Sequence, residues 1–437
     1  MSLDDVLDRH GIGARHILLF VVCFGLAIMD GVHIQTMGIS GTLVSAALHI
    51  APNRFGLILS ASEFGFMLGA LALSPLADRF GRKTLIIICG LAFAICSFAT
   101  AWATGFTSLF LLRLGTGIGM GGAGPAIVSL TSESVSARHR ARVSTLLWSA
   151  IPAGGILGGF SAAWILPAFG WQGLFQAAGA VSLIFTVLIL VLVPESLRFL
   201  HHAGAAETRL ANAARRLNIS LPPLGLVPPL AESPGSSRSA RTLFTAGRAP
   251  LTLLLWLAFL LGFMSLIGVL AWTPTLLAQT GMGVSQAAAV IGWNNIGGMI
   301  GVASAGTLME RTGGRKILVP VLLLSGCVIA ATGWSAPALF PTAGFALLTG
   351  LLLGGGTAGF IAIAATIYPT EVRSTGIGWG LAAGRVGGAV GPALIGVLVA
   401  IPLAPEKIFL AAAGPAMLSG LIILIMSRRD NTAKDID

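Results

Sequence analysis

Ionisable side chains inside apolar stretches are the residues of this chain that could do chemistry. Asp30 and His33 lie three positions apart in the first long apolar run, at about residues 17 to 39. At that spacing a carboxylate and an imidazole share one face of a helix, about 60° apart. Ionisable groups at membrane depth are costly, and they usually face a cavity and carry function. The pair indicates a functional site or, alternatively, a buried polar pair that fixes helix packing.

Other polar side chains fall at comparable depths. Three further ionisable residues within apolar runs are Glu63, Arg113 and Arg385. At about 1.5 Å per residue, four ionisable residues of the first half lie about 9 to 13 Å from the helix ends on one side of the membrane, opposite the chain termini. They are Asp30, His33, Glu63 and Arg113. Arg385 lies about 13 Å from the opposite end of its helix, nearer the midplane. An indole and two amides are expected at a similar level: Trp293, Asn294 and Asn295.

This set of side chains suits an organic anion and a proton. Burial favours the protonated form of a carboxylate, so Asp30 and Glu63 are candidate proton carriers, with Asp30 as the principal one. His33 could carry or relay the proton near neutral pH, and its spacing predicts an ion pair with Asp30. The planar fork of arginine binds a carboxylate through two parallel hydrogen bonds, so either Arg113 or Arg385 could anchor the anion.

Membrane-spanning helices must position these side chains. The chain has 437 residues, is 55% hydrophobic and only 10% charged, whereas a soluble domain carries about 25% charged residues. We therefore expect an all-α membrane protein with twelve transmembrane helices. The spans are predicted near residues 17–39, 54–75, 84–102, 107–131, 142–165, 171–194, 249–272, 285–308, 316–336, 340–366, 376–399 and 405–427.

Positive charge is distributed unevenly between the loops. Of the 26 lysine and arginine residues, only Arg54 and Lys407 lie in loops opposite the chain termini, and two lie within spans. This asymmetry follows the positive-inside rule and predicts cytoplasmic termini. The net charge of +10 therefore orients the protein in the bilayer and does not indicate a nucleic-acid partner.

No pattern in the chain predicts an enzyme, a metal site or a cofactor. The four cysteines all fall inside apolar spans and lack metal-ligand spacing. Gly117, Gly119 and Gly122 match G-x-G-x-x-G, but a dinucleotide site needs a strand before the glycines. Within a span, these glycines more readily allow close helix contact. We expect a proton gradient to be the energy source.

Two loop patterns occur in both halves of the chain. The basic loop at Ser74–Lys83 is echoed at Gly306–Lys316, and the corner at Glu133 is echoed at Glu371. Similar offsets at corresponding loops predict two six-helix pseudo-repeats. The expected division is a first bundle over 1–194, a cytoplasmic linker over 195–248 and a second bundle over 249–437. Within the linker, 207–217 reads as an amphipathic helix on the membrane surface.

The loop Ser74–Lys83 resembles the signature loop of the major facilitator superfamily, G-x-x-x-D-R-x-G-R-K, with Ser74 in place of the first glycine. In that family the loop latches the two halves of the transporter. The resemblance therefore implies a conformational role, not substrate binding, for a set of loop residues. They are Asp78, Arg79, Gly81, Arg82, Glu133, Arg142, Glu310, Arg311, Glu371 and Arg373.

Three other segments narrow the resemblance to the aromatic acid:proton symporters. Ala271–Leu277 is similar to W-[LT]-P-T-L-L at the end of their span 7, and Gly384–Pro392 is similar to G-R-x-G-x-x-x-G-P in span 11. Asp30 falls where that group carries D-G-x-D, with aspartates required for transport. In this chain His33 replaces the second aspartate.

The resemblance implies a multi-pass transporter of the bacterial inner membrane. It would import a small organic anion, above all an aromatic carboxylate, together with protons, and would act as a monomer. A transporter of a sugar, a dicarboxylate or a drug is the alternative. A membrane sensor without transport activity is the third class, although the chain shows no cytoplasmic signalling domain.

Overall fold

The structure is a computed structural model that describes residues 12–204, 206–219, 240–245, 248–312, 315–369 and 372–434. All regular structure in these ranges is helical. The first half contains α2 (Ala14–Ile39), α3 (Gly41–Ala47), α4 (Pro52–Ala72), α5 (Leu76–Phe80), α6 (Arg82–Ala99), η1 (Thr100–Trp102), α7 (Phe106–Glu133), α8 (Ala137–Trp148) and α9 (Ala150–Leu192). Next come α10 (Leu197–His202), α11 (Glu207–Leu217) and η3 (Ala240–Phe244). The second half contains α12 (Ala249–Gln279), α13 (Val284–Thr312), α14 (Arg315–Ser335), α15 (Leu339–Ile367), α16 (Arg373–Val399) and α17 (Pro405–Lys434).

Nine of the described helices are long and apolar enough to cross a membrane, so the chain is a multi-pass membrane protein. The 43 residues of α9 are broken at Gly170, where φ is 64°. Glycine adopts this left-handed conformation without steric cost, and the break divides α9 into two long pieces. Helices α7 and α13 have 28 and 29 residues but are less apolar. The predicted number of twelve spans stays a prediction.

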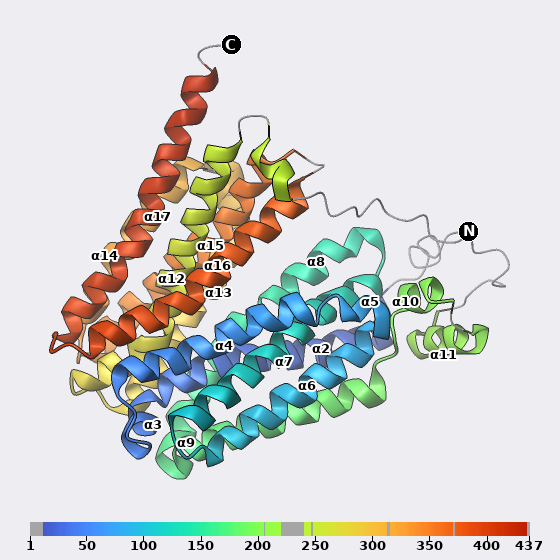
Figure 1. Cartoon of the computed structure of the whole chain (residues 1–437), viewed down its shortest axis with the longest axis horizontal. Coiled ribbons are helices and arrows are strands. Elements are labelled where there is room, and N and C mark those ends of the chain that lie inside the picture. Colours follow the sequence, from blue (N-terminus) through green and yellow to red (C-terminus); the bar gives the residue numbers. More distant parts are fainter. Residues whose placement is uncertain are drawn as a thin grey trace.

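The long helices form two bundles with corresponding neighbours (Figure 1). In the first bundle α2 packs on α9 and α4 packs on α7, while in the second α12 packs on α16 and α13 packs on α15. One apolar core draws only on residues 19–219 and another only on residues 243–426. A third core contains buried residues from both halves and joins them.

The two bundles meet at the end that carries α3 and diverge toward the chain termini (Figure 1). Helix α4 contacts α16, α9 contacts α13 and α2 contacts α12. Glycines allow this approach: a Cβ on Gly396 would lie 2.9 Å from the Cα of Gly56, and a Cβ on Gly159 would lie 2.6 Å from the backbone nitrogen of Gly292. At both places the obstacle is backbone, which cannot move aside as a flexible side chain can.

Trp272 strengthens the same contact between the bundles. Its indole is buried and donates a hydrogen bond from Nε1 to the carbonyl of Pro392, at 2.8 Å. The ring also packs edge-on against Phe55 of the other half, with 5.9 Å between centroids. The tryptophan of the W-T-P-T-L-L segment therefore ties α12 to α16 within the second bundle and packs on α4 of the first bundle.

Replacing Gly159 by leucine is expected to separate the bundles at the α3 end. The new side chain would collide with the backbone of α13, whereas Gly344 has open space around it and Gly344→Leu is the matched control. Nitroxide labels at Asn53 and Pro402, in a background without the four native cysteines, would report the separation. We expect a longer distance in Gly159→Leu only. An unchanged distance would mean that the glycine contact does not control closure.

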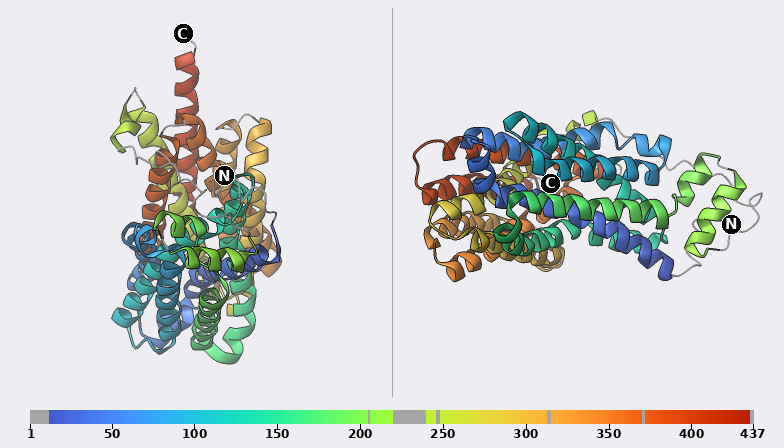
Figure 2. Two further views of the ribbon diagram at one scale, coloured as in Figure 1. Left: turned by 90° about the vertical axis from the view of Figure 1, so that its right-hand side faces the viewer. Right: turned by 90° about the horizontal axis from the view of Figure 1, so that it is seen from below.

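Helix α11 has the predicted bounds but not the predicted surroundings. Its apolar residues are buried in the core of the first half: Leu210, Ala213, Ala214 and Leu217. Arg216 Nη1 also donates to the carbonyl of Val191, at 3.3 Å, near the C-terminal end of α9. Figures 1 and 2 show α11 at the end of the bundle away from α3. The apolar face packs on the protein and not on the lipid, because the bundle itself offers an apolar surface there.

Candidate functional site

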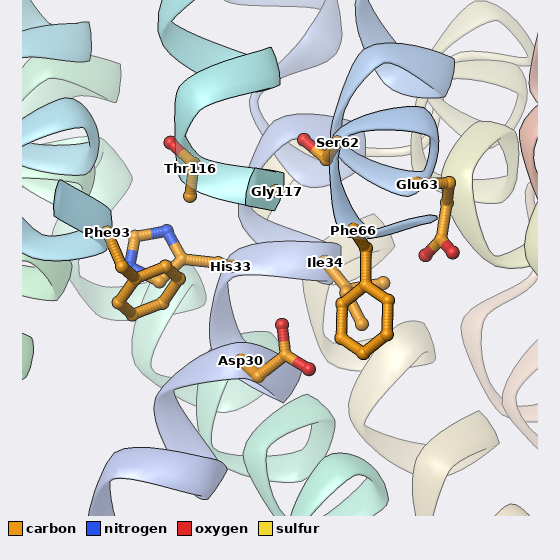
Figure 3. Close-up of a pocket in the computed structure, with 9 residues that line it drawn as sticks. All are labelled: Asp30, His33, Ile34, Ser62, Glu63, Phe66, Phe93, Thr116 and Gly117. Atoms are coloured by element: carbon orange, nitrogen blue, oxygen red, sulfur yellow. The ribbon is translucent and has the colours of Figure 1, made fainter. Parts of the chain in front are cut away.

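A pocket between α2, α4, α6 and α7 brings together three of the predicted ionisable residues (Figure 3). Its lining consists of Asp30, His33, Ile34, Ser62, Glu63, Phe66, Phe93, Thr116 and Gly117. Asp30, His33 and Glu63, which depth estimates placed in one layer, do share this pocket. Glycines bring the helices close enough to form it, since a Cβ on Gly117 would lie 2.1 Å from the carbonyl oxygen of Ser62.

Asp30 is a buried carboxylate at the wall of the pocket, and its side chain extends toward Phe66 in Figure 3. Gly31, the next residue, lets α2 lie directly on α9, since a Cβ there would be 2.0 Å from the carbonyl oxygen of Ile151. Within the described ranges, no ion pair includes Asp30.

His33 faces α6 and not Asp30. Its Nδ1 lies 3.1 Å from the hydroxyl of Ser97, and its ring meets Phe93 edge-on with 4.5 Å between centroids. The ion pair with Asp30 that the spacing predicted is not found among the described residues. Both residues share one helix face, but α6 offers a hydroxyl and an aromatic ring that turn the imidazole away. Figure 3 shows this orientation.

Glu63 forms an ion pair across the two halves of the protein. Its Oε2 lies 3.0 Å from Nη1 of Arg385, so the pair joins α4 to α16. The guanidinium carbon of Arg385 lies 3.9 Å from the ring centroid of Phe66, which also lines the pocket. A cation at this distance is attracted by the ring face. Phe66 escaped the sequence analysis, although it follows Glu63 by three positions and so shares its helix face.

Arg113 lies behind the pocket and does not line it. Its side chain is 1% exposed, and Nη2 donates to the hydroxyl oxygens of Thr116 at 3.2 Å and Thr100 at 3.4 Å. The guanidinium carbon also lies 5.0 Å from the ring centroid of Phe175. Thr116, which sequence reasoning missed, separates Arg113 from the pocket. Neither candidate anchor lines the pocket: Arg113 contacts one lining residue, Thr116, whereas Arg385 contacts two, Glu63 and Phe66.

The predicted contacts on α13 are used in helix packing instead. Asn294 Nδ2 donates to the carbonyl of Ala346 at 3.0 Å and so joins α13 to α15. Asn295 Nδ2 donates to the carbonyl of Ile291 at 2.9 Å within its own helix. Trp293 is 42% exposed and meets Phe160 edge-on. None of these three α13 side chains lines the pocket in the structure.

The loop Ser74–Lys83 forms a polar cluster at the end of the first bundle. Arg82 pairs with Asp78 at 2.8 Å and with Glu133 at 3.3 Å, and Glu133 accepts a short hydrogen bond from Ser196. Gly81 has a φ of 98°, and a Cβ there would lie 2.3 Å from the carboxylate of Glu195. These contacts all lie within the first half and tie α5 and α6 to the end of α7.

The other loop residues have fewer described contacts. The guanidinium of Arg79 lies 5.5 Å from the ring of Phe80, Arg373 donates from Nε to the carbonyl of Tyr368 at 3.4 Å, and Arg142 and Arg311 are exposed. The side chain of Glu310 and the whole of Glu371 lie outside the described residues. The divergence of the bundles at this end explains why the described partners of Arg82 come from the first half alone.

The cavity has a volume of only about 20 Å³, so a small planar anion would enter only after the surrounding helices move apart, but the groups around it suit such an anion. Phe66, Phe93 and Ile34 provide apolar walls, and a guanidinium lies at the edge with one ion-pair bond already made. Two carboxylates in contact with the pocket could exchange protons with it. The pocket thus offers aromatic faces for a ring and acid groups for proton transfer, and the Arg385 guanidinium, a cation for a negative charge, lies against its lining residues Glu63 and Phe66.

Comparison with known proteins gives consistent matches along the chain. Residues 17–345 match the Major Facilitator Superfamily. The chain is 31% identical to a gallate transporter of Pseudomonas putida, over 97% of this chain and 94% of the relative. It is 32% identical to a 3-(3-hydroxy-phenyl)propionate transporter of Escherichia coli, over 95% of each. It is 30% identical to the 4-hydroxybenzoate transporter PcaK of Acinetobacter baylyi, over 94% of this chain and 91% of that one.

Solved structures share the fold at low sequence identity. A bacterial homolog of the human lysosomal transporter Spinster, inward-facing and occupied, matches with a TM-score of 0.73 and 14% identity, over 96% of this chain and 98% of that chain. The inward-open xylose transporter XylE of E. coli matches with a TM-score of 0.71 and 16% identity, over 94% of this chain and 96% of that chain.

Proposed function

The chain belongs to the major facilitator superfamily, and on that premise we propose that it carries a small aromatic carboxylate across a membrane together with protons. It is a transporter and not an enzyme. Similar proteins named for gallate, 4-hydroxybenzoate and 3-(3-hydroxy-phenyl)propionate align with it over nearly its whole length. The observation that carries the proposal is the guanidinium of Arg385, which lies on the ring of Phe66 beside the pocket.

Arg385 would hold the carboxylate of the substrate. Its planar fork can make two parallel hydrogen bonds, and only Nη1 is engaged among the described residues. The ring of the substrate would lie against Phe66 and Ile34, where an aromatic face replaces water. Arg113 would instead stabilise the wall behind Thr116, because it is buried outside the pocket.

The orientation follows from the charge of the loops. We infer that both termini are cytoplasmic, that twelve helices span a bacterial inner membrane, and that the transporter acts as a monomer. The α3 end then faces outward and is closed by the glycine contacts and Trp272, so the structure is an inward-open state. Alternating access would open that end and bring the loop at Asp78 toward the second half.

Proton coupling is proposed for electrostatic reasons. Importing an anion against a negative-inside potential costs about 2.3 kcal/mol per charge per 100 mV, so the anion needs accompanying cations. Asp30 is buried at the pocket wall and forms no described ion pair, which suits a group that carries a proton across. The geometry leaves His33 with a packing role on α6, since its ring engages Ser97 and Phe93.

Uptake into proteoliposomes tests the proposal. With an inward proton gradient, we expect accumulation of at least one of gallate, 4-hydroxybenzoate, benzoate and 3-(3-hydroxyphenyl)propionate, and no accumulation of xylose or succinate. Collapsing the gradient with a protonophore should remove the accumulation. Transport of a sugar, a dicarboxylate or a cationic drug, without any aromatic acid, would replace the proposal by one of those alternatives.

A further inference from the structure

The positive charge of Arg385 is already balanced when the site is empty. Its Nη1 lies 3.0 Å from the carboxylate of Glu63, and this is the only ion pair of Arg385 among the described residues. The side chain of Glu63 is 6% exposed and that of Arg385 is 19% exposed. Glu63 lines the pocket and Arg385 does not, so an anion that enters from the pocket meets the guanidinium where Glu63 already pairs with it.

A second carboxylate on the same guanidinium would leave one negative charge unbalanced. In a poorly hydrated site, two carboxylates that share one cation do not both stay ionised, and one of them takes up a proton. The cost of an unpaired buried charge is larger than that of a neutral, hydrogen-bonded acid group. Binding of an anionic acid at Arg385 must then be accompanied by protonation nearby.

The other titratable groups around Glu63 do not supply the missing positive charge. On α2, Asp30 adds negative charge, and His33 is turned toward Ser97 on α6. On α7, Arg113 directs its guanidinium to Thr100 and Thr116, outside the pocket. On α16, Arg385 is itself the shared cation. No arginine or lysine of the described chain lines the pocket itself.

We propose that Glu63 takes up one proton from water each time an aromatic carboxylate binds to Arg385. The charge balance is simple: the ion pair between Glu63 and Arg385 is given up, the ion pair between the substrate carboxylate and Arg385 is formed, and one proton converts Glu63 to the neutral acid. The inference rests on the proposed function and specifies how substrate binding is linked to protons. Glu63 is then the binding-linked proton site, distinct from Asp30, whose proton crosses with the conformational change.

The experiment measures proton uptake when the purified full-length protein binds 4-hydroxybenzoate in weakly buffered detergent solution, at about pH 6 to 8.5, where the ligand carboxylate stays ionised. In the parent, we expect Glu63 to take up about one proton for each molecule of acid that binds. The affinity for the acid should fall by up to tenfold per pH unit in the alkaline range. In Glu63→Gln, 4-hydroxybenzoate should still bind, and at high pH it should bind at least as tightly as to the parent. No proton should be taken up when it binds.

Several outcomes decide the inference. Proton uptake that persists in Glu63→Gln, or that disappears in Asp30→Asn, would overturn it. A purely structural ion pair would change affinity or thermal stability but not the number of protons bound, so an unchanged proton count also contradicts it. If Glu63→Gln does not fold, the parent still decides, because binding without proton uptake is incompatible with the proposal. If the parent binds none of the aromatic acids, the proposed function fails instead.

Discussion

Replacing Asp30 by asparagine is expected to remove one coupled proton from each transport cycle, and so to lower proton-driven accumulation of the aromatic acid sharply while leaving exchange of internal for external acid intact. Asparagine keeps the size and polarity of the side chain but cannot carry a proton. Asp30 is 8% exposed, lines the pocket and has no described ion-pair partner. Removing its carboxylate should therefore leave no other side chain with an unpaired charge. One pH unit across the membrane is worth about 1.4 kcal/mol per coupled proton, so the accumulation ratio should fall about tenfold per unit.

The measurement is proteoliposome transport with and without a pH gradient, across about pH 5 to 8, for the parent and Asp30→Asn. His33→Asn is the comparison on the same helix face. Because the ring of His33 contacts Ser97 and Phe93, we expect this variant to lose thermal stability but to keep accumulation and its pH dependence. Undiminished accumulation in Asp30→Asn would rule out Asp30 as a carrier. A flattened pH profile in His33→Asn would restore the imidazole as a titrating partner.

The second large effect is expected at Arg385. Replacing it by glutamine removes a charged hydrogen bond to the substrate carboxylate, so affinity should fall by about 1.5–3 kcal/mol, or about tenfold to 150-fold. Lysine should restore only part of this affinity, because an ammonium offers neither the planar fork nor the same stacking on Phe66. Equilibrium binding to purified protein measures the change directly.

Arg113→Gln provides the contrast within the same protein. Arg113 is buried behind Thr116, so its replacement should lower the thermal midpoint more than the affinity for the acid. A large loss of affinity in Arg113→Gln, with Arg385→Gln binding like the parent, would transfer the anchoring role to Arg113. Equal affinities in all three proteins would remove both arginines from substrate recognition.

Helix periodicity predicts the depth and the face of a side chain, and this sufficed for part of the site. Asp30, His33 and Glu63 were placed in one layer by counting residues from the ends of their helices, and they do line one pocket. The bounds of α11 followed from an amphipathic pattern over 207–217 and are confirmed. These features depend on one helix at a time, which is the information that a single sequence carries.

Partners on other helices could not be predicted in this way. The ion pair between Glu63 and Arg385 joins residues 322 positions apart, and it depends on how closely α4 approaches α16. Likewise, His33 is turned by groups on α6, and Asn294 is engaged by a backbone carbonyl of α15. In each case a contact between helices decides what the side chain does, and the spacing along the chain says nothing about that contact.

The most direct test of recognition at Arg385 compares two ligands of similar shape, one with an anionic carboxylate and one with a neutral carboxamide in its place. Purified parent protein and Arg385→Gln would each be titrated with 4-hydroxybenzoate and with its neutral amide, 4-hydroxybenzamide. We expect the parent to bind the acid at least about tenfold more tightly than the amide, as the loss of one charged hydrogen bond implies. Arg385→Gln should bind the two alike. A parent that binds acid and amide equally well, or an Arg385→Gln variant that keeps the full preference for the acid, would contradict recognition of an aromatic carboxylate by Arg385.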